Sequence, residues 1–435
     1  MKIVLITFVS LAAENIRGTS ALPYHLIKGT IPNANVNAND NFIIYSFNNN
    51  GLSDEKIVEV EKELGATIKK VSLPKWYRWM FKFRLLFLRI FLKYPFVNYI
   101  KLPQPLVEEI KALNPDMIWV MGEELSRIVK QFPDFRRIQI GPDTESLYYY
   151  RMMGRRFVMN NPIDYWKCAL MYRKYARMER EFCTDENFTY YAVGEEDVRH
   201  LQQINPKVKA KFLRHPHYEV LTHFVNDNVN ANDNRKFHQP KIKVLIAGRY
   251  DLYMKQEADL LVEQICNVNV NDNVNYLPKN YVFTFLGKGW EKHVESMRQA
   301  GYEVEHITFA PDYIEEICKH DIQITPIAIG TGTKGKVLDA LANGLLVIGT
   351  PYAMENIAVE NGVSCIVYQK PEEVIKILLD IVKNDNVNVN DNEMLRYENS
   401  NRRKYEEIAA EGQRQVLKHH DRKLIAEQLF GVVTT

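Results

Sequence analysis

The chain has 435 residues, of which 46% are hydrophobic and 25% charged, and its 56 Lys and Arg balance 54 Asp and Glu to a formal net charge of +2. This composition excludes a globally disordered chain, and the near-zero charge argues against a dedicated nucleic-acid binder. The length fits two or three domains. The five cysteines are odd in number and lack CxxC spacing. Neither a disulfide framework nor a zinc site is therefore expected, and a reducing cytosol is the default compartment.

The first ten residues, MKIVLITFVS, form a short apolar run that allows two interpretations. A signal-peptide core is one, but the run is brief and lacks a clear small-residue cleavage site. We interpret it as a buried first strand, because Ile3, Val4 and Ile6 are β-branched. No uncharged apolar run in the chain reaches the roughly 18 residues that a membrane-spanning helix needs.

Short β-branched runs alternate with helical patterns along the whole chain. Alternation of this kind is typical of parallel sheets with right-handed crossovers, here in two halves. The strands expected in the first half are Ile3–Phe8, Phe42–Phe47, Met117–Val120, Arg137–Ile140 and Tyr190–Val193, and its helices include Asp54–Leu64 and Pro105–Leu113. In the second half we expect strands at Ile242–Ala247, Tyr281–Leu286, Val304–Ile307, Ile322–Pro326, Leu345–Gly349 and Cys365–Tyr368, with helices at Glu257–Ile265, Tyr313–Lys319 and Lys334–Ala342.

These elements divide the chain into two domains with a C-terminal extension. We expect an N-terminal domain over 1–220, a linker over 221–240 and a second domain over 241–392. The remaining residues, 393–435, read as helices rich in Arg, Lys and Glu. Apolar residues such as Ile408 and Leu424 recur along them, and we expect them to pack partly back on the N-terminal domain.

Four tracts of Asn, Asp, Val and Ala interrupt this pattern, at Asn33–Asn41, Val225–Asn234, Asn267–Asn275 and Asn384–Asn392. A repeated binding element is one interpretation. We favour low-complexity insertions in surface loops, where added length costs little closure entropy. The spacing and terminal Glu of an EF-hand calcium loop are absent.

The most informative stretch runs from Ile324 to Ile357. A strand ends at Pro326 and a glycine-rich loop follows, before a helix that includes Asp339. Glycines let backbone N–H groups approach an anion, and the helix N-terminus and lysines add positive charge, which suits a diphosphate. Asp339, one turn into the helix, is placed to accept hydrogen bonds from ribose hydroxyls. The loop holds Gly330, Thr331, Gly332, Thr333, Lys334, Gly335 and Lys336.

This stretch, with its following strand and Thr350-Pro351, resembles the donor-site signature of group 1, family 4-type glycosyltransferases of the GT-B fold. Gly248-Arg249, with Lys255 a few residues on, is similar to that family's phosphate-contacting Arg and Lys after the first C-domain strand. Phe285–Gly289 resembles its strand and glycine turn, with Gly287 in the turn. The resemblance covers about 241–383, and the N-terminal half fits only in layout.

The resemblance implies an α/β GT-B protein, with two Rossmann-like domains whose parallel sheets face a central cleft. It implies transfer of a sugar from a nucleotide-diphosphate sugar to an acceptor hydroxyl, with retention of anomeric configuration. Arg249, Lys255 and Lys336 would stabilise the leaving diphosphate, and no cofactor or obligatory metal is expected. Lys334 is either a further donor contact or simply solvated.

One departure from the family concerns two glutamates that many members carry eight positions apart. Thr331 and Asp339 occupy those positions here. Losing one charge-assisted hydrogen bond, worth about 1.5–3 kcal/mol, would weaken donor binding by roughly 10- to 150-fold. The presence of Asp339 in place of glutamate therefore affects the expected contact with the ribose more than the expected class of reaction.

Acceptor chemistry is expected at the carboxyl ends of the N-terminal strands. Gly18 and Thr19 follow the first strand, where we expect a loop that faces the sugar. Glu123 follows Met117–Val120, and Asp143, a third catalytic candidate, follows Arg137–Ile140. Each of these has an ordinary structural alternative, since Asp143-Thr144 before a helical run is also a typical helix start.

The segment Lys75–Tyr94 reads KWYRWMFKFRLLFLRIFLKY and contains six cations, no acid and many aromatic residues. This composition predicts an interfacial amphipathic helix on an anionic membrane. The alternative is a buried helix whose cations snorkel or pair with acids. Membrane contact would suit a lipid-linked acceptor and a peripheral cytoplasmic location on the inner face of the plasma membrane. The expected membrane contacts are Lys75, Trp76, Arg78, Trp79, Lys82 and Arg84.

Two other functions stay open at this point. Thr331 and the short Asp339 are compatible with a catalytically inactive scaffold that binds nucleotide or membrane. A nucleotide-sugar epimerase or hydrolase would have the same fold, but the donor itself or water would react in place of an acceptor. Cell-surface polysaccharide or glycolipid assembly is the expected setting for the leading hypothesis, and nucleic acid is not an expected partner.

Overall fold

The computed structural model describes residues 1–13, 18–31, 41–221, 241–271, 276–382 and 400–431. The chain forms two compact units. Unit 1 comprises Met1–Pro216, Thr331–Thr333 and Arg422–Thr435, and unit 2 comprises His217–Gly330 and Lys334–Asp421. The boundary expected at 220 thus falls after Pro216, and the expected linker lies almost wholly outside the described residues.

Unit 1 is built on a seven-stranded parallel sheet in the order β3-β2-β1-β4-β5-β6-β7. The chain starts at β1 in the middle, with Ile3 between Phe42 of β2 and Met117 of β4. The strand order reverses there, which makes the carboxyl ends of β1 and β4 a topological switch point. The strands are β1 Ile3–Thr7, β2 Phe42–Ser46, β3 Thr67–Lys70, β4 Met117–Met121, β5 Arg137–Gly141, β6 Phe188–Ala192 and β7 Ala210–Phe212.

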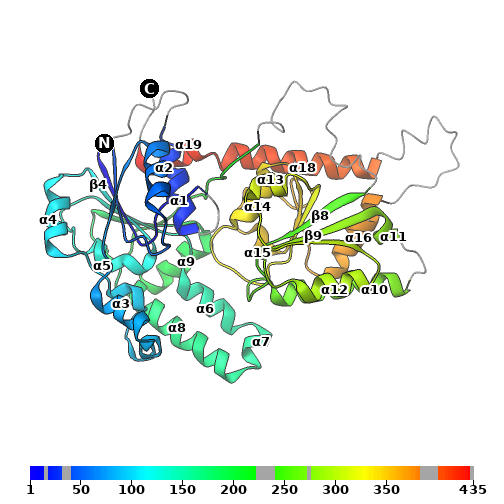
Figure 1. Ribbon diagram of the computed structural model, residues 1–435, viewed down its shortest axis with the longest axis horizontal. Coiled ribbons are helices and arrows are strands. Elements are labelled where there is room, and N and C mark those ends of the chain that lie inside the picture. The colour runs from blue at the N-terminus through cyan, green and yellow to red at the C-terminus, as the bar shows by residue number, and fades with distance from the viewer. Residues whose placement is uncertain (14–17, 32–40, 222–240, 272–275, 383–399, 432–435) are drawn as a thin grey trace. The chain divides into compact units, whose positions relative to one another are not determined.

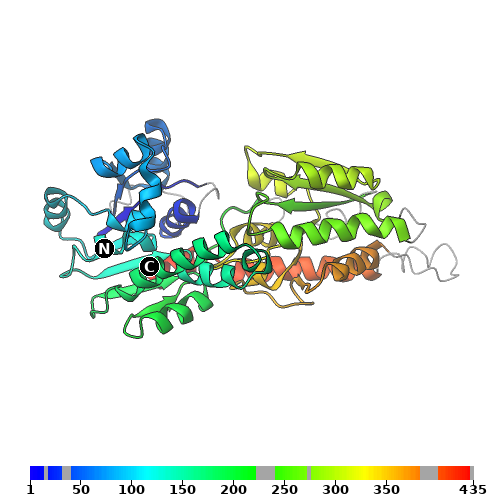
Figure 2. The same cartoon turned by 90° about the horizontal axis from the view of Figure 1, so that it is seen from below.

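Helices cover both faces of this sheet (Figures 1 and 2). Each face has its own apolar cluster, one around Ile6, Val120 and Phe188 and the other around Leu5, Ile44 and Trp119. The helices of unit 1 are α1 Gly18–Lys28, α2 Asp54–Leu64, α3 Lys75–Lys82, α4 Gln104–Ala112, α5 Ser126–Val129, α6 Glu145–Met153, α7 Arg156–Met159, α8 Pro162–Arg180, α9 Glu195–Ile204 and α19 Arg422–Phe430, with the 3-10 helices η1 Leu85–Phe91, η2 Phe96–Tyr99 and η3 Glu123–Leu125.

The predicted basic helix over Lys75–Tyr94 is shorter than expected. Helix α3 ends at Lys82, and the segment continues as the 3-10 helix η1 from Leu85. Arg84 between them has a left-handed backbone with φ of 55°, which interrupts the α-helical hydrogen bonds. The amphipathic composition therefore persists without one continuous helix.

Helix α19 completes the core of unit 1 from the far end of the chain. Ile425, Ala426, Leu429 and Phe430 are buried in the cluster around Trp119, and the Phe430 ring lies 5.4 Å from the Trp119 ring, centroid to centroid. Figure 1 shows α19 beside α1. A Cβ at Gly29 would lie 2.3 Å from the Arg422 carbonyl oxygen, so a side chain there would obstruct this packing.

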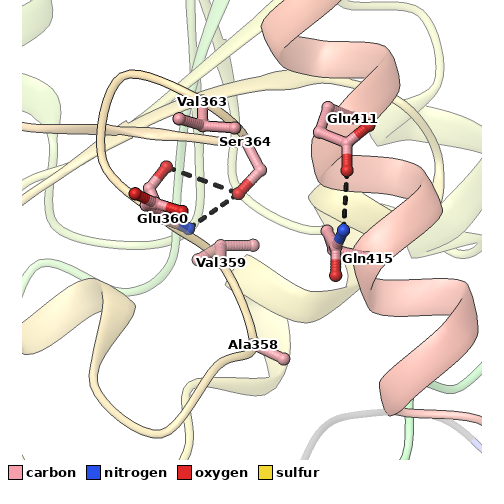
Figure 3. A pocket seen from close by; sticks show the side chains of 7 residues that line it. All are labelled: Ala358, Val359, Glu360, Val363, Ser364, Glu411 and Gln415. Carbon is pink, nitrogen blue, oxygen red and sulfur yellow. Dashed lines mark hydrogen bonds between the residues drawn. The ribbon is translucent and has the colours of Figure 1, made fainter.

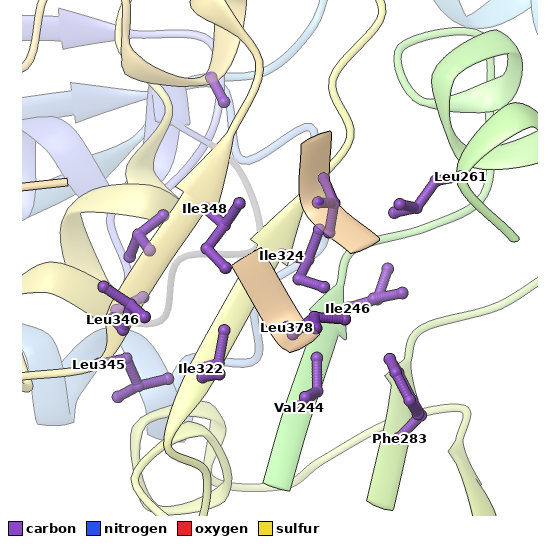
Figure 4. Packing of buried hydrophobic residues seen from close by; sticks show 14 of the residues in the cluster. Val244, Ile246, Leu261, Phe283, Ile322, Ile324, Leu345, Leu346, Ile348 and Leu378 are labelled. Carbon is purple, nitrogen blue, oxygen red and sulfur yellow. The ribbon is translucent and has the colours of Figure 1, made fainter. Parts of the chain in front are cut away.

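Unit 2 has a six-stranded parallel sheet in the order β10-β9-β8-β11-β12-β13. Its apolar core runs along the strands β8, β9, β11 and β12 (Figure 4). The strands are β8 Ile242–Ala247, β9 Tyr281–Leu286, β10 Glu303–Ile307, β11 Ile322–Thr325, β12 Leu346–Gly349 and β13 Ile366–Val367. The helices are α10 Lys255–Asn271, α11 Tyr276–Asn280, α12 Glu291–Gln299, α13 Tyr313–Ile317, α14 Gly335–Ala342, α15 Pro351–Met354, α16 Pro371–Val382 and α18 Ser400–His419.

The C-terminal extension divides between the two units. Tyr405, Ile408 and Val416 of α18 are buried in the core of unit 2, whereas α19 belongs to unit 1. Part of 393–435, helix α19, thus packs on the N-terminal unit as expected, while α18 packs on unit 2. The apolar positions of α18 are buried in the core of its own unit, and sequence periodicity alone does not identify the partner of a helix.

Most of the Asn-rich tracts lie outside the described residues. The exceptions are Asn41, at the end of the first tract, and the start of the third tract, where Asn267–Asn271 extends helix α10 rather than forming a loop. Of the described residues, none belongs to a helix that combines the length and hydropathy required to span a bilayer.

Candidate donor site

Three segments of unit 2 meet at two glycines that follow neighbouring strands. Gly248 follows β8 with φ of 121°, and Gly287 follows β9 with φ of 138°. A Cβ at Gly287 would lie 2.4 Å from the Gly248 carbonyl oxygen, and one at Gly248 would lie 2.3 Å from Lys336 Nζ. Only glycine fits both positions, and the two turns and the Lys336 ammonium lie together.

The Lys336 side chain is held inside this junction. Its Nζ donates to the Ala247 carbonyl oxygen at 3.2 Å and lies 3.4 Å from Met254 Sδ. Burial lowers the pKa of Lys336 to about 8, although the Asp251 charge opposes that shift. An ammonium held with so few partners is poised to gain from an incoming anion.

Helix α14 adds its N-terminus to the same region. The helix starts at Gly335 directly after Lys334, so the first N–H groups of the helix lie beside both lysines. A Cβ at Gly330 would lie 2.5 Å from Lys334 Cε, so the loop backbone passes tightly over the Lys334 side chain. The expected combination of glycines, cations and helix terminus is thus present within unit 2.

Asp339, the expected contact of the donor ribose, is a buried residue. Its side chain is only 1% exposed. Burial raises the pKa of Tyr218 and of Tyr313, and the Asp339 charge adds to both shifts. A hydrogen bond from Asp339 to a ribose hydroxyl remains a prediction.

Arg249 and Lys255 lie at the carboxyl end of β8. Both side chains are exposed, Arg249 directly after Gly248 and Lys255 at the start of α10. The chain between them is fixed by backbone hydrogen bonds from Met254 and Lys255 to the Asp251 carbonyl oxygen. Their contact with a diphosphate remains a prediction.

The tip of the glycine-rich loop groups with unit 1. Thr331 Oγ1 donates to Asp143 Oδ1 at 3.1 Å, and the Gly332 N–H donates to Asp197 Oδ2 at 2.9 Å. Thr333 Oγ1 donates to the Val193 carbonyl oxygen at 2.6 Å. Asp143 and Thr331, both predicted from the sequence, are therefore in contact. Asp197 was not predicted, because a lone Asp in the first turn of a helix looks like an ordinary capping residue.

The acceptor-side candidates of unit 1 are two residues at a helix start, Gly18 and Thr19, and one buried carboxylate, Glu123. Gly18 and Thr19 begin helix α1, so the loop expected there is in fact a helix start. Glu123 is 3% exposed, and its Oε1 accepts a hydrogen bond from the Glu145 N–H at 3.2 Å. This contact fits the structural alternative, a carboxylate at the N-terminus of α6.

Burial at this edge of the sheet favours protonated carboxyl groups. It raises the pKa of Glu123, with the Glu179 charge adding to the shift. It also raises the pKa of Glu145 to about 8, with contributions from the Glu124 and Asp143 charges. Sequence analysis missed Glu179, which lies within α8 and accepts hydrogen bonds from the backbone N–H and the hydroxyl of Ser146.

The predicted membrane segment carries its aromatic residues on the surface. Trp79 is 58% exposed and Phe91 81%, while Tyr77 alone among the α3 residues is buried. The buried-helix alternative is therefore wrong. We define the α3–η1 patch as the exposed apolar residues Trp76, Trp79, Phe81, Phe83, Phe87, Leu88, Ile90 and Phe91.

A shallow pocket of about 290 Å³ lies elsewhere in unit 2, between the loop at Ala358–Ser364 and helix α18 (Figure 3). Ser364 Oγ accepts from the Glu360 N–H at 2.7 Å on one wall, and Gln415 Nε2 donates to Glu411 Oε1 at 2.6 Å on the other. None of the predicted site residues lines this pocket. Across the described ranges, no group of three or more His, Cys, Asp or Glu side chains is arranged to hold a metal ion.

Part of the chain matches a known family. Residues 241–384 match the family described as glycosyl transferases group 1. No curated protein matches the sequence of the chain.

Similar solved structures extend over the whole chain. Anabaena HepE, solved with UDP and glucose, is 13% identical with a TM-score of 0.59 and covers 99% of this chain and 98% of its own. WaaG, a glycosyltransferase involved in lipopolysaccharide biosynthesis, is 12% identical with a TM-score of 0.57 and 99% coverage of both chains. Sucrose-phosphate synthase from Thermosynechococcus elongatus is 11% identical with a TM-score of 0.58, covering 99% of this chain and 97% of its own.

These similarities confirm the predicted fold class, two Rossmann-like units of the GT-B type. Residues 241–384 therefore match group 1 glycosyl transferases, and the chain has the GT-B fold along its length.

Proposed function

We propose that the protein transfers a sugar from a nucleotide-diphosphate sugar to an acceptor hydroxyl, with retention of anomeric configuration and without an obligatory metal. The observation that carries this proposal is the Lys336 ammonium, enclosed between the Gly248 turn and the first turn of α14. Anabaena HepE, of the same fold, is solved with UDP and with UDP-glucose.

The leaving diphosphate defines the roles of the cations. Departure of the sugar leaves negative charge on the β-phosphate, and positive groups fixed near that charge stabilise the transition state. Lys336 supplies a fixed positive charge, and the α14 N-terminus supplies backbone N–H groups. Arg249 and Lys255, exposed at the end of β8, contact the phosphates when the donor is bound.

A thermal-shift screen tests donor binding directly. The purified protein is heated with UDP, GDP, ADP or CMP and with their sugars, with and without EDTA. A ligand at 100 times its Kd raises stability by about 2.7 kcal/mol, enough for a visible shift. We expect an EDTA-resistant shift with one nucleoside diphosphate. A shift that needs a divalent cation would refute the metal-free site, and no shift at all would favour the inactive scaffold.

Turnover tests the reaction class. With the preferred donor and acceptor glycans, we expect transfer, and NMR of the product should show the anomeric configuration of the donor. Release of free sugar, or isomerisation of the donor without an acceptor, would instead indicate a hydrolase or an epimerase.

We further propose that the acceptor is lipid-linked and that the protein works in cell-surface polysaccharide or glycolipid assembly, on the inner face of the plasma membrane. The α3–η1 patch supports this assignment, because tryptophans and cations on one exposed surface suit an anionic bilayer. WaaG, which has a similar fold, is itself involved in lipopolysaccharide biosynthesis. Sedimentation with phosphatidylglycerol vesicles tests the contact, and recovery of all protein in the supernatant would refute it.

A further inference from the structure

A second exposed apolar surface lies on unit 1, where helix α7 meets the start of helix α8. Met159 is 61% exposed, Ile163 65% and Trp166 55%, and Tyr165 is also exposed. We define these four residues as the α7–α8 tip. Exposed large apolar side chains that gather in one place, surrounded by polar groups, indicate an interaction surface.

The tip is a regular structure and not a frayed end. Pro162 occupies the first turn of α8, and the Asn161 side chain accepts from the Ile163 N–H at 3.1 Å and from the Asp164 N–H at 3.4 Å. A capped helix start of this kind holds its side chains in place. The apolar exposure is therefore built into the fold.

Positive charge surrounds the tip. Between Arg151 and Arg180 the sequence has eight Lys and Arg but only two acids, Asp164 and Glu179. Glu179 is fully buried, and Asp164 pairs with Lys167 at 3.1 Å. Arg156 of α7 and Arg173 of α8 are exposed, so the surface near the tip carries positive charge, which suits an anionic partner.

Helix α8 joins the tip to the α3–η1 patch. Lys174 Nζ donates to the carbonyl oxygens of Arg89 and Ile90, and Arg177 Nη1 donates to the Lys93 carbonyl oxygen at 3.4 Å. Lys174 lies eight residues beyond Trp166, about 12 Å along the helix axis. Figure 1 shows α3, α7 and α8 along the same lower edge of unit 1.

We propose that the α7–α8 tip is a second membrane contact, which enters the same anionic bilayer as the α3–η1 patch. This inference rests on the proposed membrane location and extends it from one contact to two. Trp and Tyr are the side chains that settle at the level of lipid headgroups, and the cations around the tip face the phosphates. Two contacts joined by a rigid helix fix the orientation of unit 1 on the membrane, which a single patch does not.

The test compares three variants of the full chain by sedimentation with vesicles. The tip variant combines Met159→Ser, Ile163→Ser and Trp166→Ser, and the patch variant combines Trp79→Ser, Phe87→Ser and Phe91→Ser. The matched control combines Val58→Ser and Leu424→Ser, which remove exposed side chains from α2 and α19, at the other end of unit 1 in Figure 1. Phosphatidylcholine vesicles are compared with vesicles that contain phosphatidylglycerol.

We expect the tip variant to bind phosphatidylglycerol vesicles roughly tenfold or more weakly than the unaltered chain, because three apolar side chains no longer enter the bilayer. The control should bind normally, and all variants should keep the unaltered melting temperature and donor binding. Brominated lipids should quench Trp166 fluorescence, measured as the difference between the unaltered chain and Trp166→Phe.

Three outcomes would overturn the proposal in distinguishable ways. If only the patch variant loses binding, the tip is not a membrane contact but the proposed membrane location stands. If the unaltered chain ignores the vesicles, that location fails, and donor binding then shows whether the transferase function survives. If sedimentation velocity shows a dimer that the tip variant abolishes, a second copy of the chain covers the tip.

Discussion

Helices α14 and α3 are both eight residues long, with one lysine in α14 and two in α3, yet they are built in opposite ways. Six residues of α14 are buried, and its chemistry comes from backbone turns and an enclosed ammonium. Only Tyr77 of α3 is buried, and its aromatic side chains face solvent. The comparison teaches that the candidate donor site depends on close packing, whereas the proposed membrane surface depends on composition alone. Substitutions in the donor site should therefore reduce activity strongly, whereas substitutions on the exposed surface of α3 should have small effects.

The largest effect is expected from Lys336→Ala. Removing the enclosed ammonium should lower kcat/KM for transfer at least about 100-fold, because a fixed charge that meets the leaving diphosphate is lost. Turnover with the preferred donor is the measurement, and the melting temperature checks the fold. Lys376→Ala, an exposed lysine of α16, is the control and should leave turnover unchanged. Normal turnover in Lys336→Ala would mean that the diphosphate binds elsewhere.

Gly248→Ala should rank second. A Cβ there would lie 2.3 Å from Lys336 Nζ, and the positive φ of 121° adds backbone strain of about 1–3 kcal/mol. Gly301→Ala is the matched control, since φ is 87° and nothing lies within 4 Å of its Cβ. Both variants should melt earlier, but only Gly248→Ala should weaken donor binding. Equal donor affinities of the Gly248→Ala and Gly301→Ala variants would show that the Lys336 side chain moves away from the added Cβ without weakening donor binding.

The pH dependence of donor binding should be a smaller effect. The pKa of Lys336 is lowered to about 8, and a bound diphosphate favours the charged form and raises this pKa. Affinity should therefore be constant well below pH 8 and fall as the pH rises through 8. Calorimetry at pH 8.5 in buffers of different ionisation enthalpy should detect proton uptake on binding. Proton uptake that persists in Lys336→Ala would assign the titration to another group.

The smallest effect is expected from Phe91→Ser. Its side chain is 81% exposed, so the free energy of unfolding should change by no more than about 0.5 kcal/mol. Urea denaturation measures this change, while vesicle binding should weaken. A loss of several kcal/mol would show that the patch supports the fold of unit 1, and the contrast with α14 would fail.

Sequence reasoning predicted the two parallel sheets because their strands are short β-branched runs. It missed the edge strand β3, Thr67–Lys70, where only Ile68 is buried and three polar residues hide the pattern. It also placed Lys75–Tyr94 in one helix, because periodicity does not register a single residue such as Arg84 with a left-handed backbone.

The candidate site was predictable to the extent that it is local in sequence. Gly248, Gly287 and Lys336 carry glycine and charge signals that any reader of the chain can find, and the structure brings them together. The contacts of Asp197 and Glu179 depend on residues more than thirty positions away, at Gly332 and Ser146. Nothing in their own neighbourhood distinguishes them from ordinary helix residues, so only the fold reveals them.

Helix α19 has a consequence for the order in which the chain is made. Phe430 covers Trp119 and Phe42 in the core of unit 1, and the ribosome synthesises it after all of unit 2. At translation rates of roughly 5–20 residues per second, the strands of unit 1 wait many seconds for their last helix. During that interval the apolar face of the first sheet that Phe430 covers lies open.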